Sequence, residues 1–326
     1  GIDHIYLQVY RAGCAYYDSK IAGRQEYEKI IEAAGLDTIE VLLKEAKKND
    51  IEVFAWINVL SLSVNKEADI LSKFGESVLT KDQHNRPPII EGAPDELDKF
   101  YKREAQFFLE PGDPRVQQYC VSIAGEIVKR YPLFSGIHLD YIRYPYALGF
   151  IPGSMFNEYG LGYGYGQKNV ERFQKERGLN PYAIKDRRHC QSWDGWRRDQ
   201  VSSVVEKISR KVRGKDPSFK ISCAVISTPY MAYIAAFQEW PRWLREKTVD
   251  YVVLMSYTTD SDFLQQAVIS SMAQSPHGKV YAGIGAFLVK EDPHAVLSQY
   301  RLVKDLKPGG VVLFSYDDIV DTELKF

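Results

Sequence analysis

The side chains best suited to chemistry lie in the segment Phe134–Pro145, which reads FSGIHLDYIRYP. This segment predicts a buried strand, and strand alternation puts His138 and Asp140 on the same face of a sheet. Asp140 would lie near the carboxyl end of the strand, which is where parallel barrels build their active sites. Because burying a bare carboxylate is costly, we expect Asp140 to be paired, solvated or functional.

Further polar and aromatic side chains fall at the ends of other apolar runs. Strand alternation near residues 5–10 and 51–58 gathers them on one face, and two arginines follow in loops. Amides, guanidinium groups and aromatic rings suit a neutral polyhydroxy ligand, because hydroxyl groups take hydrogen bonds and sugar faces stack on rings. The candidate substrate-binding residues are Gln8, Tyr10, Arg11, Trp56, Asn58, His138, Arg143 and Tyr257. The alternative for His138 is a hydrogen-bonded core histidine.

Hydrolysis of a glycosidic bond uses two carboxyl groups, one as acid and one as nucleophile or base. Asp140 is the first candidate, and its alternative role is a structural pair with Arg143 or a loop cap. For the second we favour Asp260 over Asp317, because the loop before Asp260 also carries Tyr257. Either aspartate could instead be an ordinary turn residue. Weaker candidates are Glu158 and Glu239.

Seven short apolar runs predict parallel strands with amphipathic helices between them, which favours an α/β barrel. The runs lie near residues 5–10, 51–58, 136–142, 220–226, 250–257, 279–285 and 310–316. Seven strands are one short of an eight-stranded barrel, so we expect the first β/α unit to precede Gly1. The alternative is an incomplete barrel.

We expect residues 1–326 to form one domain with two long insertions, residues 59–114 (the first insertion) and residues 143–192 (the second insertion). Both insertions would follow the carboxyl ends of strands. Connections of this length are commonly functional. The second is rich in Gly and Tyr, and the chain as a whole has 22 Tyr and 5 Trp.

Composition excludes several classes of function. The net charge of −1 over 326 residues gives no electrostatic case for nucleic acid or anionic membrane. No apolar run reaches the roughly 20 residues that span a bilayer, and no signal peptide is visible. Metal-binding, P-loop and GxSxG signatures are absent from the sequence. We therefore expect no cofactor, and the sequence does not indicate an oligomeric state.

The segment Gly136–Pro145 resembles the fourth-strand motif of a bacterial glycosyl-hydrolase-like barrel family. Other segments are similar in the same order, namely Tyr6–Gly13, Phe54–Asn58, Leu109–Val116 and Trp193–Asp199. The resemblance covers most of the chain. It implies a (β/α)8 TIM barrel that here lacks its first strand, a carbohydrate substrate, an extracytoplasmic location and a catalytic role for Asp140. A more distant likeness to chitinase-like barrels lacks their glutamate, since no Glu occurs in Gly136–Pro145.

These observations predict a glycoside hydrolase that acts on an oligosaccharide or polysaccharide such as a bacterial envelope glycan. The alternative is a glycan-binding barrel that has kept the groove and lost the acid/base pair. A third possibility, a metal-dependent deacetylase, has only His138 with Asp140 to support it.

Overall fold

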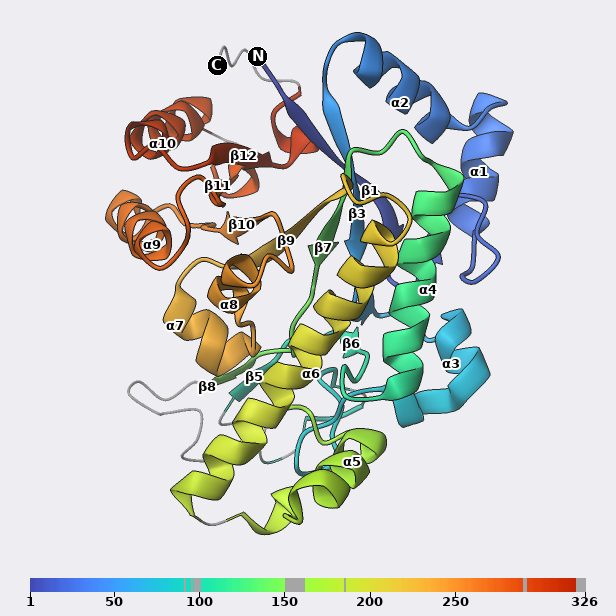
Figure 1. The fold of residues 1–326 in the computed structure, drawn as a ribbon, viewed down its shortest axis with the longest axis vertical. Coiled ribbons are helices and arrows are strands. Elements are labelled where there is room, and N and C mark those ends of the chain that lie inside the picture. Colours follow the sequence, from blue (N-terminus) through green and yellow to red (C-terminus); the bar gives the residue numbers. More distant parts are fainter. Residues whose placement is uncertain are drawn as a thin grey trace.

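The computed structural model describes residues 1–90, 92–94, 96, 101–149, 162–184, 186–289 and 292–320. Its centre is a curled eight-stranded sheet in the order β12-β11-β10-β9-β7-β3-β1-β2 (Figure 1). The seven predicted strands are confirmed as one parallel series. They are β1 (His4–Arg11), β3 (Glu52–Asn58), β7 (Gly136–Asp140), β9 (Lys220–Ile226), β10 (Tyr251–Met255), β11 (Val280–Gly285) and β12 (Gly310–Phe314). The eighth, β2 (Cys14–Ala15), folds back antiparallel on β1.

Helices cover the outer face of this sheet, as Figure 1 shows. Those that follow strands of the series are α1 (Gln25–Ala34), α2 (Thr38–Lys48), α4 (Pro114–Arg130), α6 (Arg187–Arg213), α7 (Pro229–Met231), α8 (Trp240–Arg245), α9 (Ser261–Ala273) and α10 (Pro293–Asp305). The start of α4 is fixed by Asp113, whose side chain accepts the Arg115 N–H, with Pro114 in the first turn. The apolar stripe of α4 is buried, and α4 packs along α6.

The strand series curls so far that side chains of its first strands contact side chains of its last strands across the interior. The Tyr6 and Tyr251 hydroxyls of β1 and β10 are 2.9 Å apart, and the Trp56 ring of β3 lies 5.6 Å from the Phe314 ring of β12. Aromatic side chains thus fill the barrel interior. The architecture is that of a (β/α)8 barrel, as predicted, with an open seam between β1 and β12, which are not paired in the described sheet.

The two insertions meet beyond the carboxyl ends of β3 and β7. The first contains β4 (Ser61–Ser63), α3 (Asp69–Phe74), β5 (Tyr101–Arg103) and β6 (Phe107–Phe108), and the second contains β8 (Ala147–Gly149) and α5 (Gln167–Arg177). An antiparallel pairing of β5 with β8 joins the insertions, and β4 pairs with β6. The loop that leaves β7 is therefore held between them.

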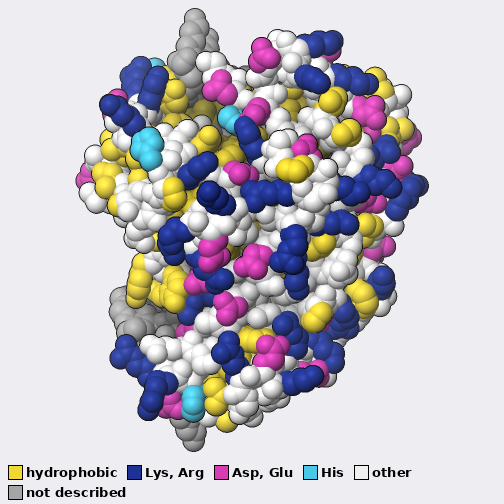
Figure 2. All heavy atoms as spheres, in the orientation of Figure 1, with side chains coloured by type: hydrophobic (Ala, Val, Ile, Leu, Met, Phe, Trp, Pro, Cys, Tyr) yellow, Lys and Arg dark blue, Asp and Glu magenta, His cyan; other side chains and the backbone are white. Residues whose placement is uncertain are grey.

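The surface carries both signs of charge. Figure 2 shows lysine and arginine side chains interspersed with aspartate and glutamate over the visible face. Among the described residues, no helix combines the length and apolarity that crossing a membrane requires.

Candidate active site

Asp140 is the last residue of β7, and its carboxylate is half-buried. One oxygen accepts the Tyr141 backbone N–H at 2.7 Å, and the other accepts the Trp56 indole N–H at 3.1 Å. Burial raises the pKa of Asp140 above its usual value of 3.8, while these two donors and the nearby Arg143 charge oppose the increase. No ion pair involves Asp140 in the part of the chain that the structure describes. The arrangement leaves a carboxyl group that retains a proton more readily than in water.

Aromatic rings line one side of Asp140. Trp56 packs edge-on against Phe314, and Tyr257 stacks on Phe314 with ring centroids 5.5 Å apart and an interplanar angle of 17°. Phe287 packs edge-on against both Tyr257 and Phe314. Burial raises the pKa of Tyr257, and the Asp140 charge adds to the increase. Aromatic faces beside a carboxyl group suit a sugar ring.

Arg143 is fully engaged by the protein. Its guanidinium forms a two-pronged ion pair with Glu104 of the first insertion, with N–O distances of 2.8 and 2.6 Å. The ring of Tyr146 lies 4.1 Å from the guanidinium carbon, and Glu104 also accepts the Tyr146 backbone N–H at 2.9 Å. The structure therefore pairs Arg143 with Glu104, a residue that the sequence analysis did not single out.

The polar residues of β1 and β3 divide between two faces. Gln8 donates to Asn58 at 3.3 Å, and Asn58 is the ladder partner of Asp140. A bulge between Gln8 and Tyr10 shifts the register, and the Tyr10 hydroxyl bonds Tyr119 of α4. This corrects the expectation that Tyr10 shares the face of Gln8, because the extra residue reverses the alternation.

His138 lies one layer deeper in the barrel than Asp140. Its ring is 6% exposed, is hydrogen bonded to Ser222 at 2.8 Å and packs 4.6 Å from the Tyr6 ring. Burial lowers the pKa of His138 to about 3. The side chain is therefore a neutral core histidine. Arg11 is exposed at the end of β1.

Asp260 and Asp317 lie in local turns at the surface. Asp260 is exposed and caps α9 by accepting the N–H groups of Asp262 and Phe263. Asp317 is exposed in the turn Tyr316–Asp318. Of the weaker candidates, Glu239 pairs with Arg242 at 3.1 Å, and Glu158 lies outside the described residues.

A second buried acid, Glu110, ties the insertions together. It has no exposed surface and accepts four hydrogen bonds. The hydroxyls of Thr80 and Tyr144 donate at 2.8 and 2.7 Å, and the backbone N–H groups of Gly112 and Gly166 donate at 3.1 and 3.2 Å. Its sequence signal was a carboxylate set between the apolar run 107–109 and a Pro-Gly turn.

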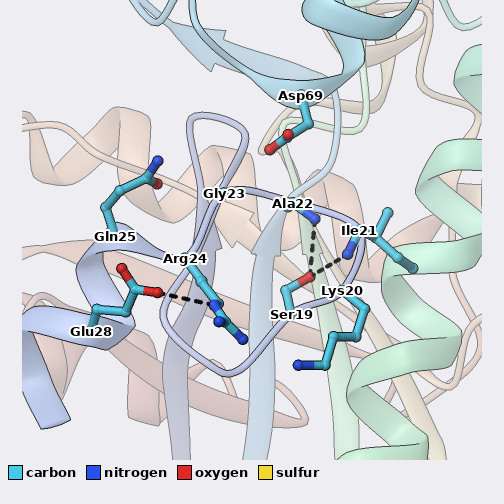
Figure 3. Close-up of a pocket in the computed structure, with 9 residues that line it drawn as sticks. All are labelled: Ser19, Lys20, Ile21, Ala22, Gly23, Arg24, Gln25, Glu28 and Asp69. Atoms are coloured by element: carbon cyan, nitrogen blue, oxygen red, sulfur yellow. Dashed lines mark hydrogen bonds and ion pairs between the residues drawn. The ribbon is translucent and has the colours of Figure 1, made fainter.

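A cavity of about 280 Å³ lies between the loop of residues 19–23, the start of α1 and Asp69 of α3 (Figure 3). The Ser19 hydroxyl accepts the backbone N–H groups of Ile21 and Ala22 inside this loop. None of the residues that line this cavity is among those described above around Asp140. Among the described residues, no group of three or more His, Cys, Asp or Glu side chains could hold a metal ion.

Comparisons with known proteins identify the family of the chain. The model of the family described as glycosyl hydrolase-like 10 matches residues 1–285. Glycosyl hydrolase DigH of Escherichia coli (strain K12) is 26% identical over 273 residues, which cover 79% of this chain and 55% of the relative. Glycosyl hydrolase YngK of Bacillus subtilis (strain 168) is 22% identical over 274 residues, which cover 79% of this chain and 46% of the relative. The chain spans about half the length of these curated relatives.

Solved structures show the same fold. A β-galactosidase from Bacillus circulans sp. alkalophilus superposes with a TM-score of 0.60 at 13% identity, covering 96% of this chain and 46% of that chain. An α-galactosidase from Lactobacillus brevis gives a TM-score of 0.55 at 12% identity, covering 99% of this chain and 34% of that chain. The family expected from Gly136–Pro145 is confirmed: the chain belongs to the glycosyl hydrolase-like 10 family and has its barrel fold.

Proposed function

We propose that this chain hydrolyses a glycosidic bond of an oligosaccharide or polysaccharide, with Asp140 as the general acid. The observation that carries the proposal is the state of the Asp140 carboxyl, which is half-buried, free of ion pairs among the described residues and raised in pKa by burial. A carboxyl group whose pKa is raised holds its proton more readily than in water and can protonate a leaving glycosidic oxygen.

The hydrogen bonds of Asp140 leave room for this role. Each oxygen accepts one donor, from Tyr141 or from Trp56, so a proton on the carboxyl can still point to the substrate. The rings of Trp56 and Tyr257 would stack on the sugar, and the Gln8–Asn58 pair would bind its hydroxyl groups. An envelope glycan as substrate and an extracytoplasmic location are part of the same proposal and rest on family resemblance.

For the second carboxyl group we propose Glu104 in place of Asp260 or Asp317. Arg143 follows Asp140 by three residues, its charge opposes the rise in the pKa of Asp140, and its guanidinium is paired with Glu104. A carboxylate paired with arginine and a carboxyl group with a raised pKa form the opposed pair that glycoside hydrolysis requires.

A specific observation also supports a second candidate, a barrel that binds glycans without cleaving them. Both oxygens of Glu104 are occupied by Arg143, while Asp260 caps α9 and Asp317 is exposed in a turn. If Glu104 only holds Arg143 in place, the site has one available carboxyl group, and it binds a sugar without hydrolysis.

The test compares the wild-type chain with Asp140→Asn on a panel of peptidoglycan-derived and plant glycans. Release of reducing ends should fall by about a thousandfold in the variant, while glycan binding stays. Asp317→Asn serves as the control and should keep wild-type turnover. Normal hydrolysis by Asp140→Asn would overturn the assignment, and binding without any turnover by the wild type would favour the second candidate.

The role of Glu104 needs its own experiment. With an activated aryl glycoside, Glu104→Ala should lose turnover, and added azide should restore it and yield a glycosyl azide if Glu104 is the nucleophile. Loss without rescue, together with a shifted pH profile, would assign Glu104 to holding Arg143.

A further inference from the structure

A second cavity, of about 270 Å³, lies between the two insertions, and Asp140 is not among its lining residues. The second insertion contributes the rings of Tyr165 and Tyr182, and the first contributes Lys81, Asn85 and Glu76. Two aromatic rings thus share one cavity with an ammonium, an amide and a carboxylate. This is the combination that a pyranose needs, since it has one face of C–H groups and a rim of hydroxyl groups.

The two tyrosines form a fixed platform. The Tyr165 ring packs on Trp193 with centroids 5.3 Å apart, and the Tyr182 ring lies 5.2 Å from Tyr165 at an angle of 47°. The Tyr182 hydroxyl donates to the Tyr165 carbonyl at 3.5 Å, yet the side chain as a whole is 55% exposed. A large ring that is anchored at its hydroxyl and open on its face is suited to stacking.

The opposite wall is also preformed. Tyr165 donates its backbone N–H to the Lys81 carbonyl at 3.0 Å, which joins the two walls directly. Asp82 accepts the N–H groups of His84 and Arg86, both at 2.9 Å, and so fixes the turn that carries Asn85. A site that is already shaped avoids the entropy of ordering its walls when a ligand binds.

The polar groups of this cavity are available for a ligand. The side chains of Lys81 and Asn85 have no hydrogen-bond partner among the residues that the structure describes. Among the charged lining residues, Lys81 is cationic and Glu76 and Glu171 are anionic, so the cavity favours a neutral ligand over an anion. The volume lies just below the usual range for ligand pockets, which suits a single sugar unit.

We propose that this cavity is a distal subsite that binds one neutral pyranose unit of a glycan chain by stacking on Tyr182 and Tyr165. The choice of a sugar as occupant rests on the proposed function. Both insertions follow strand ends on the Asp140 side of the barrel, so one polymeric substrate can engage both places. The subsite then favours long glycans over short ones, because the second contact is intramolecular once the first has formed.

The experiment measures glycan binding at this cavity and does not depend on catalysis. The probes are a β-1,4-linked N-acetylglucosamine hexamer and a β-1,4-linked glucose hexamer, titrated into the full chain carrying Asp140→Asn and 3-fluorotyrosine at position 182. The fluorine resonance should shift saturably with at least one probe. Calorimetry should then show about tenfold weaker binding in Tyr182→Ala, and nearly unchanged binding in Tyr182→Phe, which keeps the ring.

Leu133→Ala is the matched control, because Leu133 is 40% exposed but precedes β7 at the other end of the barrel. This variant should bind like its parent. A fluorine resonance that stays unchanged at millimolar concentrations of both probes, or equal affinities in Tyr182→Ala and its parent, would overturn the subsite. The subsite survives if Asp140→Asn hydrolyses glycans normally while the resonance shifts, and in that case the catalytic proposal fails alone.

Discussion

Asp140 and Glu110 are acids at the same end of the barrel, and the protein surrounds them in different ways. Glu110 has no exposed surface and accepts four hydrogen bonds from two hydroxyls and two backbone N–H groups. Asp140 is half-buried and accepts two. Burial raises the pKa of both.

This difference separates an acid that holds structure from one that is available for chemistry. The hydrogen-bonding capacity of Glu110 is used by the chain itself, so it cannot serve a substrate. Each carboxylate oxygen of Asp140 can accept a further hydrogen bond, and the residue is only half-buried. A raised pKa is therefore not a sufficient sign of catalysis, and the number of donors decides between the two readings.

The largest expected effect is on Glu110. Each of its oxygens accepts a backbone N–H, from Gly112 or from Gly166, so a glutamine amide would oppose an N–H in either orientation. Glu110→Gln should lower the free energy of unfolding by about 3 kcal/mol in chemical denaturation. The exposed Glu45→Gln should change it little, and equal stability of the two variants would remove the structural role of Glu110.

A smaller effect is expected from removing one donor of the same group. Tyr144→Phe keeps the shape of the buried ring and deletes the hydroxyl that bonds Glu110 at 2.7 Å. The free energy of unfolding should fall by about 1.5 kcal/mol, because a buried acceptor loses one of its partners. The double variant Tyr144→Phe/Glu110→Gln should lose less stability than the sum of the losses in the two single variants. A double-mutant cycle measures this difference.

Asp140 should show its effect through pH. Its folded pKa is raised, so the stability linked to its proton is full below pH 3.8 and is lost as the pH rises through the folded pKa. Asp140→Asn cannot titrate, so its free energy of unfolding relative to wild type should increase by about 1 kcal/mol from acid to neutral pH. The asparagine amide opposes the N–H of Tyr141 or of Trp56, and this cost is present at every pH. A difference between the two proteins that does not depend on pH would contradict the burial argument.

The smallest effect concerns the donor to Asp140. Trp56→Phe keeps a ring near Phe314 but deletes the indole N–H that favours the ionised carboxyl. The pKa of Asp140 should rise, and the basic limb of the kcat/KM profile should move to higher pH by an amount that corresponds to about 1 kcal/mol or less. Trp243→Phe, in a distant helix, should leave the limb in place.

The sequence was sufficient for the barrel and for the position of Asp140. Seven apolar runs predicted the strands because buried parallel strands need continuous apolar sequence. The Tyr10 position was wrong because one bulge reverses strand alternation, and the residues around Val9 carry no Gly to mark it.

The partners of the acids could not be predicted from sequence. Asp260 caps a helix, as local turn chemistry also allowed. The roles of Glu104 and Glu110 depend on contacts with Arg143 and Tyr144, more than 30 residues away along the chain. Such contacts form only when the two insertions fold against each other, and the periodicity of apolar residues in the sequence does not predict them.

The long helix α6 has a consequence for engineering. Its 27 residues span about 40 Å, and Trp193 and Trp196 near its start pack on Phe173 of α5, while Val204 and Ile208 lie in the barrel core. The single helix α6 therefore sets the orientation of α5 relative to the barrel. To transfer substrate preference to another barrel of this kind, α6 should be transferred together with both insertions. Insertions transferred alone would lose the helix that orients them.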